Sequence, residues 1–531
     1  MERRNDVTRG FFDMAVRITY ATMSADNEEL NTAYEKAIAD AESRLGETHG
    51  VIVNGKARTD RELFEERSPI DSDIVVGRYA QATDEDIDDA VAAADAFQPE
   101  WEGIGWEARR DLMLQAADIM QEQVFDLAAL ITYEVGKNRL EALGDAQETV
   151  DFLRYYSKQM TDNDGFVRPL GSLSDNEHNT SVLRPWGVWA VISPFNFPLA
   201  LAGGPSIGAL ITGNTVVVKP SNAGALMALE FYRVMTEAGL PEGALHIVTG
   251  GDETGDHLAH HDDLDGLTFT GSHEVGMYLY RTVNERRPKP VTAEMGGKNP
   301  AIVTKTADLD VAAEGIARGA FGFSGQKCSA TSRVYVEDDV YDEFVEKLVS
   351  RTKGLQVGAP MENGVFVGPV IDHSAVERFK EAVAEAESNG GEVLVGGKVR
   401  EDGDFARGNY VDPTVVSAPL ESWIWEKELF VPLLAVTKVS DLDEGLKLSN
   451  NTPFGLTAGL FSGDDDEIDK WFNGIEAGVT YVNRAAGATT GAWPDIQSFG
   501  GWKGSGTSGA GGGGPWYLRQ FLREQSRTLV K

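Results

Sequence analysis

Regular alternation between short apolar runs and helical segments, over residues 188 to 293, limits what this chain can fold into. Strand–helix alternation with short connections predicts a parallel sheet that helices cover on both faces. Ligands of such sheets bind beyond the carboxyl ends of the strands. The predicted strands are 188–192, 215–218, 245–248, 266–269 and 290–293, and the helices between them are 198–212, 224–238, 252–260 and 274–285.

The rest of the chain predicts further elements on either side of this region. A length of 531 residues implies more than one domain. A second alternating region extends from about 300 to 483, and a glycine-rich stretch, 500–514, leads to a final apolar piece, 515–530. Thr83-Asp84-Glu85-Asp86 is a capping box that opens a helix to about residue 97. Other predicted elements are helices over 25–45, 106–135 and 139–161, a strand-rich region over 51–76, and strands over 301–303, 332–336 and 433–439.

The acidic character of the chain narrows the class of partner. The net charge is −36, and the acidic residues are spread along the chain rather than gathered in a tail. This distribution predicts a solvated acidic shell, as in proteins adapted to high salt. It argues against nucleic acid and anionic membranes as partners, since both require basic patches. An acidic interaction protein is the rival interpretation, but the apolar periodicity is too strong for a disordered chain.

Two segments bear on membranes and location. Residues 1–20 contain no apolar core region and do not form a secretory signal, so a cytoplasmic protein is expected. Residues 185–218 contain no charged residue and are long enough to cross a membrane. Four prolines interrupt any single helix there, which favours buried strands around one buried helix.

The only cysteine, Cys328, lies in Phe-Gly-Phe-Ser-Gly-Gln-Lys-Cys-Ser-Ala, 321–330. A lone cysteine can form neither an internal disulfide nor a CxxC motif. It is therefore either a buried inert thiol or a nucleophile, and free cysteine is often buried. Small neighbours predict an approachable loop, and Lys327 provides a cation that can favour the thiolate. This stretch alone leaves both interpretations open.

Three further features follow predicted strands. Asn196, in Ser-Pro-Phe-Asn-Phe-Pro (193–198), is either a helix cap or a hydrogen-bond donor to a developing oxyanion. Glu294, in Glu-Met-Gly-Gly-Lys-Asn-Pro (294–300), is either an ion-pair partner or a general base. Phe-Thr-Gly-Ser-His-Glu-Val-Gly (269–276) places a glycine turn at a helix start, where backbone N–H groups can bind a phosphate.

Together with Cys328, these segments resemble the aldehyde dehydrogenase superfamily over almost the whole chain. Further resemblance lies in Gly-Asn-Thr-Val-Val-Val-Lys-Pro (213–220), Lys-Glu-Leu-Phe-Val-Pro (427–432), Asn-Thr-Pro-Phe-Gly-Leu-Thr (451–457) and Ser-Phe-Gly-Gly-Trp-Lys-Gly-Ser-Gly (498–506). The resemblance implies an α/β fold with a Rossmann-like dinucleotide-binding domain (1–162 and 185–290), an α/β catalytic domain (291–484) and a small β oligomerisation arm (163–184 and 507–531). A homo-oligomer is accordingly expected.

The resemblance also implies roles for individual residues. Cys328 would be the nucleophile, Asn196 an oxyanion donor and Glu294 the base. The cofactor would be NAD, with NADP as the alternative. Lys219 would bind the adenosine ribose, Ser272 the pyrophosphate, and Glu428 with Phe430 the nicotinamide ribose and ring. The full set of expected cofactor contacts is Ser193, Phe195, Lys219, Ser221, Asn222, Gly271, Ser272, Gly276, Glu428 and Phe430.

Within the superfamily, the chain most resembles enzymes that oxidise L-glutamate 5-semialdehyde, formed from 1-pyrroline-5-carboxylate, to glutamate in proline degradation. The supporting segments are 133–138, 151–156 and 321–333. In that group the serine after the cysteine and a later glycine–small pair bind the α-carboxylate of the substrate. Here these would be Ser329 with Gly491 and Ala492, and Phe197 would line the aliphatic part.

Two departures from the family pattern leave questions open. Asn222 stands where the family usually has a glutamate that binds the ribose and repels a 2′-phosphate, so the choice between NAD and NADP is undecided. The stretch 485–490 is longer than expected, so Gly487-Ala488 competes with Gly491-Ala492 for the carboxylate.

Alternative functions remain at this stage. A dehydrogenase of another semialdehyde or of an aromatic aldehyde would use the same residues. A cysteine hydrolase or acyltransferase would require a histidine base, but the sequence contains none between His273 and His373. A catalytically silent subunit would be expected to lack Cys328 or Glu294. Three histidines at helical spacing (His257, His260 and His261) could bind a metal, but a surface helix is favoured and no metal is expected.

Overall fold

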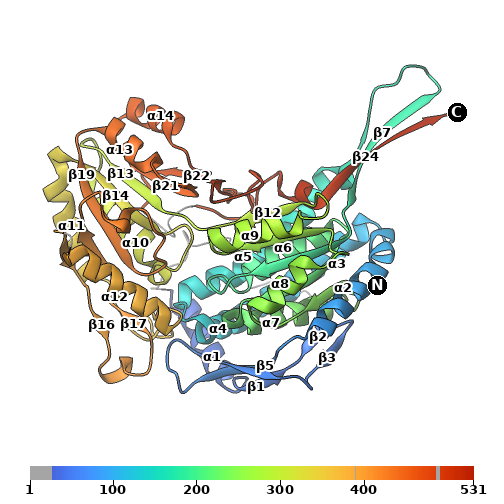
Figure 1. The fold of residues 1–531 in the computed structure, drawn as a ribbon, viewed down its shortest axis with the longest axis horizontal. Coiled ribbons are helices and arrows are strands. Elements are labelled where there is room, and N and C mark those ends of the chain that lie inside the picture. The colour runs from blue at the N-terminus through green and yellow to red at the C-terminus, as the bar shows by residue number, and fades with distance from the viewer. Residues whose placement is uncertain (1–26, 389, 486–490) are drawn as a thin grey trace, which may run out of the picture.

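The protein is described by a computed structural model that covers residues 27–388, 390–485 and 491–531. Two seven-stranded sheets form the centres of its two lobes (Figure 1). The first lobe contains the predicted parallel sheet, and the second contains the alternating region that follows it. The two lobes together confirm the predicted mixed α/β fold class.

The first sheet has the order β12-β11-β8-β9-β10-β2-β3. Its strands from β12 to β10 are parallel, and the β2–β3 hairpin is added antiparallel at one edge. The chain moves from β8 through β9 to β10 and then returns to β11 on the other side of β8. This reversal creates a crevice at the carboxyl ends of β8 and β11, where ligands of such sheets bind. The strands are β2 Val51–Val53, β3 Lys56–Arg58, β8 Val188–Ser193, β9 Thr215–Pro220, β10 Leu245–Ile247, β11 Gly266–Thr270 and β12 Val291–Glu294.

Helices α6 to α9 connect these strands, in the predicted order and close to the predicted bounds. The uncharged stretch forms β8, α6 and β9, and α6 is buried all round because it packs between α5 and the sheet. Among the residues that the structure describes, no helix combines the length and apolar character that crossing a membrane requires. The connecting helices are α6 Ala200–Ile211, α7 Ala225–Glu237, α8 Asp252–His260 and α9 His273–Val283.

The helices before the first sheet differ from prediction in two places. The single helix predicted over 106–135 is divided at Gln123, which has φ −104° and ψ 11°. Helix α2 continues past Phe97 because Trp101 is fully buried and its indole N–H donates to Leu210 O at 2.9 Å. The elements are α1 Glu28–Glu42, α2 Asp84–Gly103, α3 Trp106–Glu122, α4 Val124–Val135 and α5 Arg139–Asp162, with a small sheet of β1 Glu47–His49, β4 Leu63–Arg67 and β5 Val75–Ala80.

The second sheet has the order β15-β18-β19-β14-β13-β21-β22, parallel except for the edge strand β15. Strand β12 pairs with β11, so the first sheet continues four residues past the predicted domain boundary at residue 290. The strands are β13 Asn299–Val303, β14 Thr331–Glu337, β15 Glu392–Val395, β18 Thr414–Ser417, β19 Leu433–Val439, β21 Thr457–Phe461 and β22 Val479–Val482. The helices are α10 Leu309–Phe321, α11 Tyr341–Lys353, α12 His373–Ser388, α13 Leu442–Asn450 and α14 Asp465–Gly474, and two small pairs are β16 Val399–Arg400 with β17 Tyr410–Val411 and β20 Phe454–Gly455 with β23 Trp502–Lys503.

A three-stranded sheet projects from the first lobe (Figure 1). It consists of β6 Val167–Pro169, β7 Glu177–Pro185 and β24 Leu522–Val530, and β7 pairs with β24 along its whole length. Of the C-terminal residues predicted to belong to the arm, 507–531, only those from β24 onward lie in it. The preceding turn of 3-10 helix, Tyr517–Phe521, packs into the first lobe, because Phe521 is fully buried against Trp189 and Tyr517.

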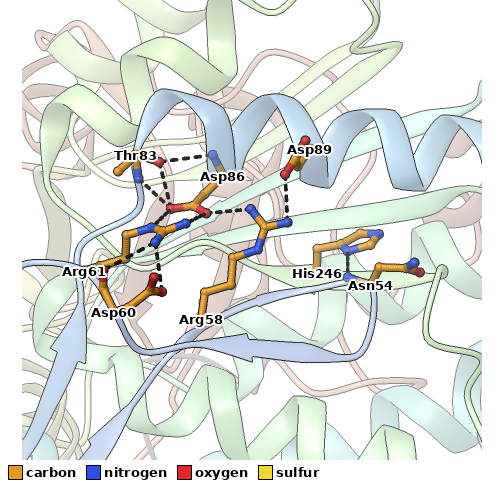
Figure 2. A network of polar contacts seen from close by, with 8 residues as sticks. All are labelled: Asn54, Arg58, Asp60, Arg61, Thr83, Asp86, Asp89 and His246. Atoms are coloured by element: carbon orange, nitrogen blue, oxygen red, sulfur yellow. Dashed lines mark hydrogen bonds and ion pairs between the residues drawn. The ribbon is translucent and has the colours of Figure 1, made fainter.

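A buried polar network fixes the start of α2 to the β2–β3 hairpin (Figure 2). Thr83 and Asp86 form the predicted capping box, with Asp86 N donating to Thr83 Oγ1 at 3.2 Å. The Asp86 carboxylate accepts from Arg58 at 2.7 Å and from Arg61 at 2.8 Å. Burial alone would raise the pKa of Asp86, but these bonds outweigh it and hold that pKa well below its usual range. Arg58 also pairs with Asp89 at 2.7 Å.

Replacing Asp86 by Asn should lower the free energy of unfolding by about 3 kcal/mol, because one member of a buried ion-pair network loses its charge. Denaturant unfolding followed by circular dichroism measures this. Asp89→Asn is the matched control: its pair with Arg58 is partly exposed, and the expected loss is below about 1 kcal/mol. Equal losses in the two variants would contradict the assignment of Asp86 as the centre of the network.

Candidate active site

A cavity of about 1350 Å³ opens at the carboxyl ends of β8, β9 and β11. It extends from Lys219, at the end of β9, to Cys328 in the second lobe. The predicted site residues that line it are Ser193, Phe195, Asn196, Lys219, Ser221, Asn222, Gly271, Ser272, Cys328, Glu428 and Phe430. Residues far apart in the sequence are thus brought to the edge of the sheet where the strand order predicts a ligand.

The lining of this cavity suits a dinucleotide. Ser272 is the N-cap of α9, so the first N–H groups of that helix lie at the cavity and can bind a phosphate. The buried Ser193 hydroxyl has no hydrogen-bond partner among the described residues, which leaves it available to a ligand. Ser221 and Asn222 follow β9 at the start of a turn of 3-10 helix.

Gly276 does not line the cavity, in contrast to the expectation that it contacts the cofactor. A Cβ at this position would lie 2.5 Å from Met295 Sδ. The glycine therefore allows α9 to pack closely on the segment after β12, and its effect on the cavity is through the position of that helix.

The loop that carries Cys328 begins with strained backbone. Three successive residues lie in the left-handed region of φ, which residues other than glycine seldom adopt. Their φ values are 49° for Phe323, 55° for Ser324 and 70° for Gly325. Ser324 Oγ donates to Gly368 O at 2.8 Å. Buried contacts of this kind hold the turn, as strained backbone at functional sites requires.

Gln326 anchors the same loop from inside the protein and is fully buried. Its side chain accepts from Ile371 N at 2.7 Å and donates to Pro369 O at 3.3 Å. Its backbone carbonyl accepts from Asn196 Nδ2 at 3.1 Å. One residue therefore sets the position of the cysteine loop relative to the oxyanion donor predicted from the sequence.

The Cys328 thiol is half-buried at the wall of the cavity. Burial raises its pKa, the carboxylates of Glu428 and Glu294 raise it further, and the N–H groups of Ser329 and Cys328 oppose this. Lys327 does not supply the predicted cation, because its ammonium bonds to Glu141 on α5 at 2.6 Å. Glu141 therefore balances the charge that was expected to favour the thiolate, and the raised pKa favours the protonated thiol.

Asn196 is buried and belongs to the segment between β8 and α6. Its amide nitrogen carries two hydrogens, and one is donated to Gln326 O. The second can be donated into the cavity that Asn196 and Cys328 both line. Asn196 does not cap α6, whose N-cap residue is Leu199.

Glu294 ends β12 and lies behind the cavity wall, outside the lining residues. Its carboxylate accepts from Gly501 N at 3.0 Å and has no cationic partner among the described residues. Burial raises the pKa of Glu294 to about 8, and the Gly501 bond opposes the shift. A carboxylate with this pKa can accept a proton near neutral pH.

Glu428 and Phe430 close the second-lobe side of the cavity. Glu428 accepts from Gly297 N at 2.9 Å, and burial raises its pKa to about 7. A Cβ at Gly296 would lie 2.1 Å from the Glu428 carboxylate, so a larger residue there would displace that side chain. Phe430 has φ 57°, and its ring meets that of Phe195 edge-on at 5.9 Å across the cavity.

The residues predicted to bind the substrate lie outside the dinucleotide cavity. Lys137 Nζ is positioned 3.5 Å from the centre of the Phe197 ring. Ser329 is buried, and its carbonyl accepts from Thr457 Oγ1 at 3.2 Å. Gly491 N donates to Gln497 Oε1 at 2.8 Å, whereas the competing pair Gly487-Ala488 lies outside the described residues. Ala492 follows Gly491 directly.

Sequence reasoning missed a group of buried charges on and near α5. Lys137 and Asp145 form a fully buried ion pair at 2.9 Å. Burial raises the pKa of Glu148, on the same helix, to about 8. Glu141 bonds to Lys327, as described above. Glu141, Asp145 and Glu148 are spaced i, i+4 and i+7, which places them on one face of the helix. The neighbouring sequence does not indicate that this face is buried.

Comparison with known proteins identifies the family. Residues 56–526 match the aldehyde dehydrogenase family. The chain belongs to this family. The resemblance read from the sequence, including the group that acts on glutamate semialdehyde, is confirmed by similar proteins. Curated 1-pyrroline-5-carboxylate dehydrogenases include one from Halalkalibacterium halodurans (37% identical, covering 94% of this chain and 96% of that one) and one from Geobacillus kaustophilus (38% identical, 96% and 98%).

A solved structure agrees with this assignment. The 1-pyrroline-5-carboxylate dehydrogenase from Thermus with bound NAD superposes with a TM-score of 0.90 at 32% identity, and the match covers 96% of this chain and 98% of that one. The aldehyde dehydrogenase fold predicted from the sequence is therefore confirmed. Membership also makes the chain an NAD(P)-dependent oxidoreductase of aldehydes, as predicted.

The histidines of α8 lie against carboxylates in this aldehyde dehydrogenase. His257 Nε2 lies 2.8 Å from Asp88 Oδ1, and His260 Nδ1 lies 3.4 Å from Asp256 Oδ1. Over the described ranges, no three His, Cys, Asp or Glu side chains are arranged to hold a metal ion.

The raised pKa of Cys328 predicts slow alkylation by iodoacetamide. Only the thiolate reacts, so at about pH 7.5 the rate should be at least tenfold below that of free cysteine and should keep rising above about pH 9. Because the chain has one cysteine, the mass increase reports on this site alone. Glu428→Gln should react faster, since one of the two carboxylates that oppose the thiolate is removed. A rate that levels off below about pH 8 would show a stabilised thiolate instead.

Proposed function

We propose that the chain oxidises L-glutamate 5-semialdehyde, in equilibrium with 1-pyrroline-5-carboxylate, to L-glutamate with NAD⁺ as the oxidant, in the degradation of proline. The observation that carries the proposal is the convergence of Cys328, Asn196 and Glu428 on one dinucleotide-sized cavity. Relatives that span 94% or more of the chain and are named 1-pyrroline-5-carboxylate dehydrogenase support the choice of substrate.

The first chemical step joins Cys328 to the aldehyde. The neutral thiol releases its proton to solvent and becomes the nucleophile. The sulfur then adds to the carbonyl carbon. The resulting oxyanion accepts hydrogen bonds from the second N–H of Asn196 and from the Cys328 backbone N–H. Both donors are fixed beforehand by Gln326 and its loop, so they need no reorganisation.

The second step releases the acid. NAD⁺ supplies the acceptor for the hydride that leaves the former aldehyde carbon. Its expected contacts are Lys219 and Asn222 at one end, Ser193, Ser221 and Ser272 along the middle, and Glu428 with Phe430 at the other. A thioester remains on Cys328. Glu294 then accepts a proton from water as the water attacks this thioester, and it passes that proton to the departing sulfur, which frees the acid and restores the thiol.

The substrate carboxylate is proposed to bind the Ser329 hydroxyl and the N–H groups of Gly491 and Ala492. The Gly491 N–H now donates to Gln497, so this donor changes partner when the carboxylate binds. Phe197, held under the Lys137 ammonium, is proposed to line the aliphatic part. This set provides neutral donors to an anion and adds no cation next to the thiol.

A cysteine hydrolase finds less support. Such an enzyme would use a histidine to activate the thiol. His257 and His260 line the cavity but pair with Asp88 and Asp256, and His273 bonds to Gly504 O. Over the described ranges, no histidine is hydrogen-bonded to Cys328.

We also propose that the protein is a cytoplasmic homo-oligomer. The support for assembly is the exposed arm, in which eight of the nine residues of β24 are open to solvent. A strand with this much exposed surface is suited to packing against a second copy of the chain. The single cysteine agrees with a reducing compartment.

Turnover with a panel of aldehydes tests the substrate. The assay follows NADH absorbance in the presence of NAD⁺. The kcat/KM for glutamate semialdehyde should be at least about 100-fold above that for succinate semialdehyde, propionaldehyde and aromatic aldehydes. These compounds lack the α-carboxylate at the proposed distance from the aldehyde. Efficient turnover of an aromatic aldehyde and none of glutamate semialdehyde would refute the proposal.

Replacing Glu294 by Gln should separate the two steps. The variant should produce a burst of about one NADH per active site and then almost none, because the thioester forms and water is no longer activated. In the wild type, steady-state kcat should rise with pH through about 8, because the base works only when ionised. Cys328→Ala is the control and should give no burst. A normal steady state in Glu294→Gln would mean that another group activates water.

A further inference from the structure

The end of the cavity around Lys219 carries an unusual number of carboxylates. Asp252, Glu253 and Asp256 of α8 line it, together with Asp84 at the start of α2. All four side chains are exposed at the rim. This is the end where the adenosine ribose is expected, and a 2′-phosphate on that ribose is the only difference between NADP and NAD.

Lys219 is the buried cation that lines this end. Burial lowers the pKa of Lys219, and the carboxylate of Asp252 opposes that shift. The stem of Lys219 also lies beside Gly255, between Asp252 and Asp256 on α8.

Neighbouring basic side chains lie against carboxylates. Arg58 and Arg61, beside the start of α2, bind the buried Asp86, and Arg58 reaches Asp89 as well (Figure 2). His257 lies 2.8 Å from Asp88 and 3.4 Å from Asp84. Among the residues described, none of these groups offers an unpaired charge to a phosphate.

We infer that Asp252, Glu253 and Asp256 on α8, with Asp84 opposite them, select NAD against NADP and replace the carboxylate that the family usually carries at the position of Asn222. The inference rests on the use of NAD(P) in the proposed function. A 2′-phosphate carries up to two negative charges at neutral pH. Each carboxylate within about 8 Å of it disfavours binding by roughly fivefold at low salt.

An alternative role for these residues is local. Asp252 and Glu253 lie in the first turn of α8, where acidic side chains stabilise any helix. The first two turns of α11 offer a matched comparison, because Asp342, Glu343 and Glu346 have the same spacing and are also exposed but lie away from the cavity.

The test measures binding of NADH and NADPH separately from catalysis. Fluorescence titration of the full chain, without aldehyde, gives the ratio of the two dissociation constants. In the wild type at about 0.1 M salt NADH should bind at least 100-fold more tightly. In the triple variant D252N/E253Q/D256N that ratio should fall by at least about tenfold, and in the control D342N/E343Q/E346Q it should stay within about twofold of the wild type.

The salt dependence of the NADH/NADPH binding ratio provides a second test on the unmodified protein. The screening length shrinks from about 10 Å at 0.1 M to about 3 Å at 1 M, so the NADH preference should decrease over this range while circular dichroism shows an intact fold. A ratio that neither salt nor the triple variant changes would overturn the inference, as would an equal change in the α11 control. Failure of the semialdehyde assay would leave these binding ratios measurable, so the two proposals fail separately.

Discussion

The fully buried Gln326 is the contact on which the arrangement of the active site depends. Through its side chain it joins the cysteine loop to the backbone at Pro369 and Ile371, and through its carbonyl it joins that loop to Asn196 in the first lobe. Nucleophile and oxyanion donor come from different lobes, so neither fold alone could fix their separation. A buried amide whose groups are all bonded is costly to displace, which makes this link rigid.

Burial that is only partly compensated is the common electrostatic property of the site. Cys328, Glu294 and Glu428 all have raised pKa values, and burial is the first cause for each. Lys327 and Lys137 are paired with Glu141 and Asp145, and the charges of Lys298 and Arg378 lower the pKa of Glu428 only in part. The protonated form of the thiol is thus favoured, and Glu294 is a stronger base than a solvated carboxylate. Both properties suit a nucleophile that should react only with bound substrate.

Local periodicity made much of the fold predictable. The alternation over 188–293 predicted the strands of the first sheet and their helices, and the Thr83–Asp86 pattern predicted a cap that the structure contains. Eleven of the expected site residues line the cavity, because residues that follow parallel strands gather at one edge of a sheet. The features that differ from prediction depend on contacts between residues distant in sequence. Lys327 bonds to Glu141, 186 residues away, and α2 extends to Trp101, whose indole N–H donates to Leu210 O. A single sequence does not display such pairings.

The arm has a consequence for synthesis of the chain. Ser181 on β7 and Glu524 on β24 bond across the pair although 343 residues separate them. While the polypeptide is being made, one edge of β7 has no partner until nearly all of both lobes has emerged from the ribosome. An open edge invites pairing with foreign strands. The many polar residues of β7, including Glu177, His178 and Asn179, are then useful to the nascent chain, because they keep the waiting strand in water.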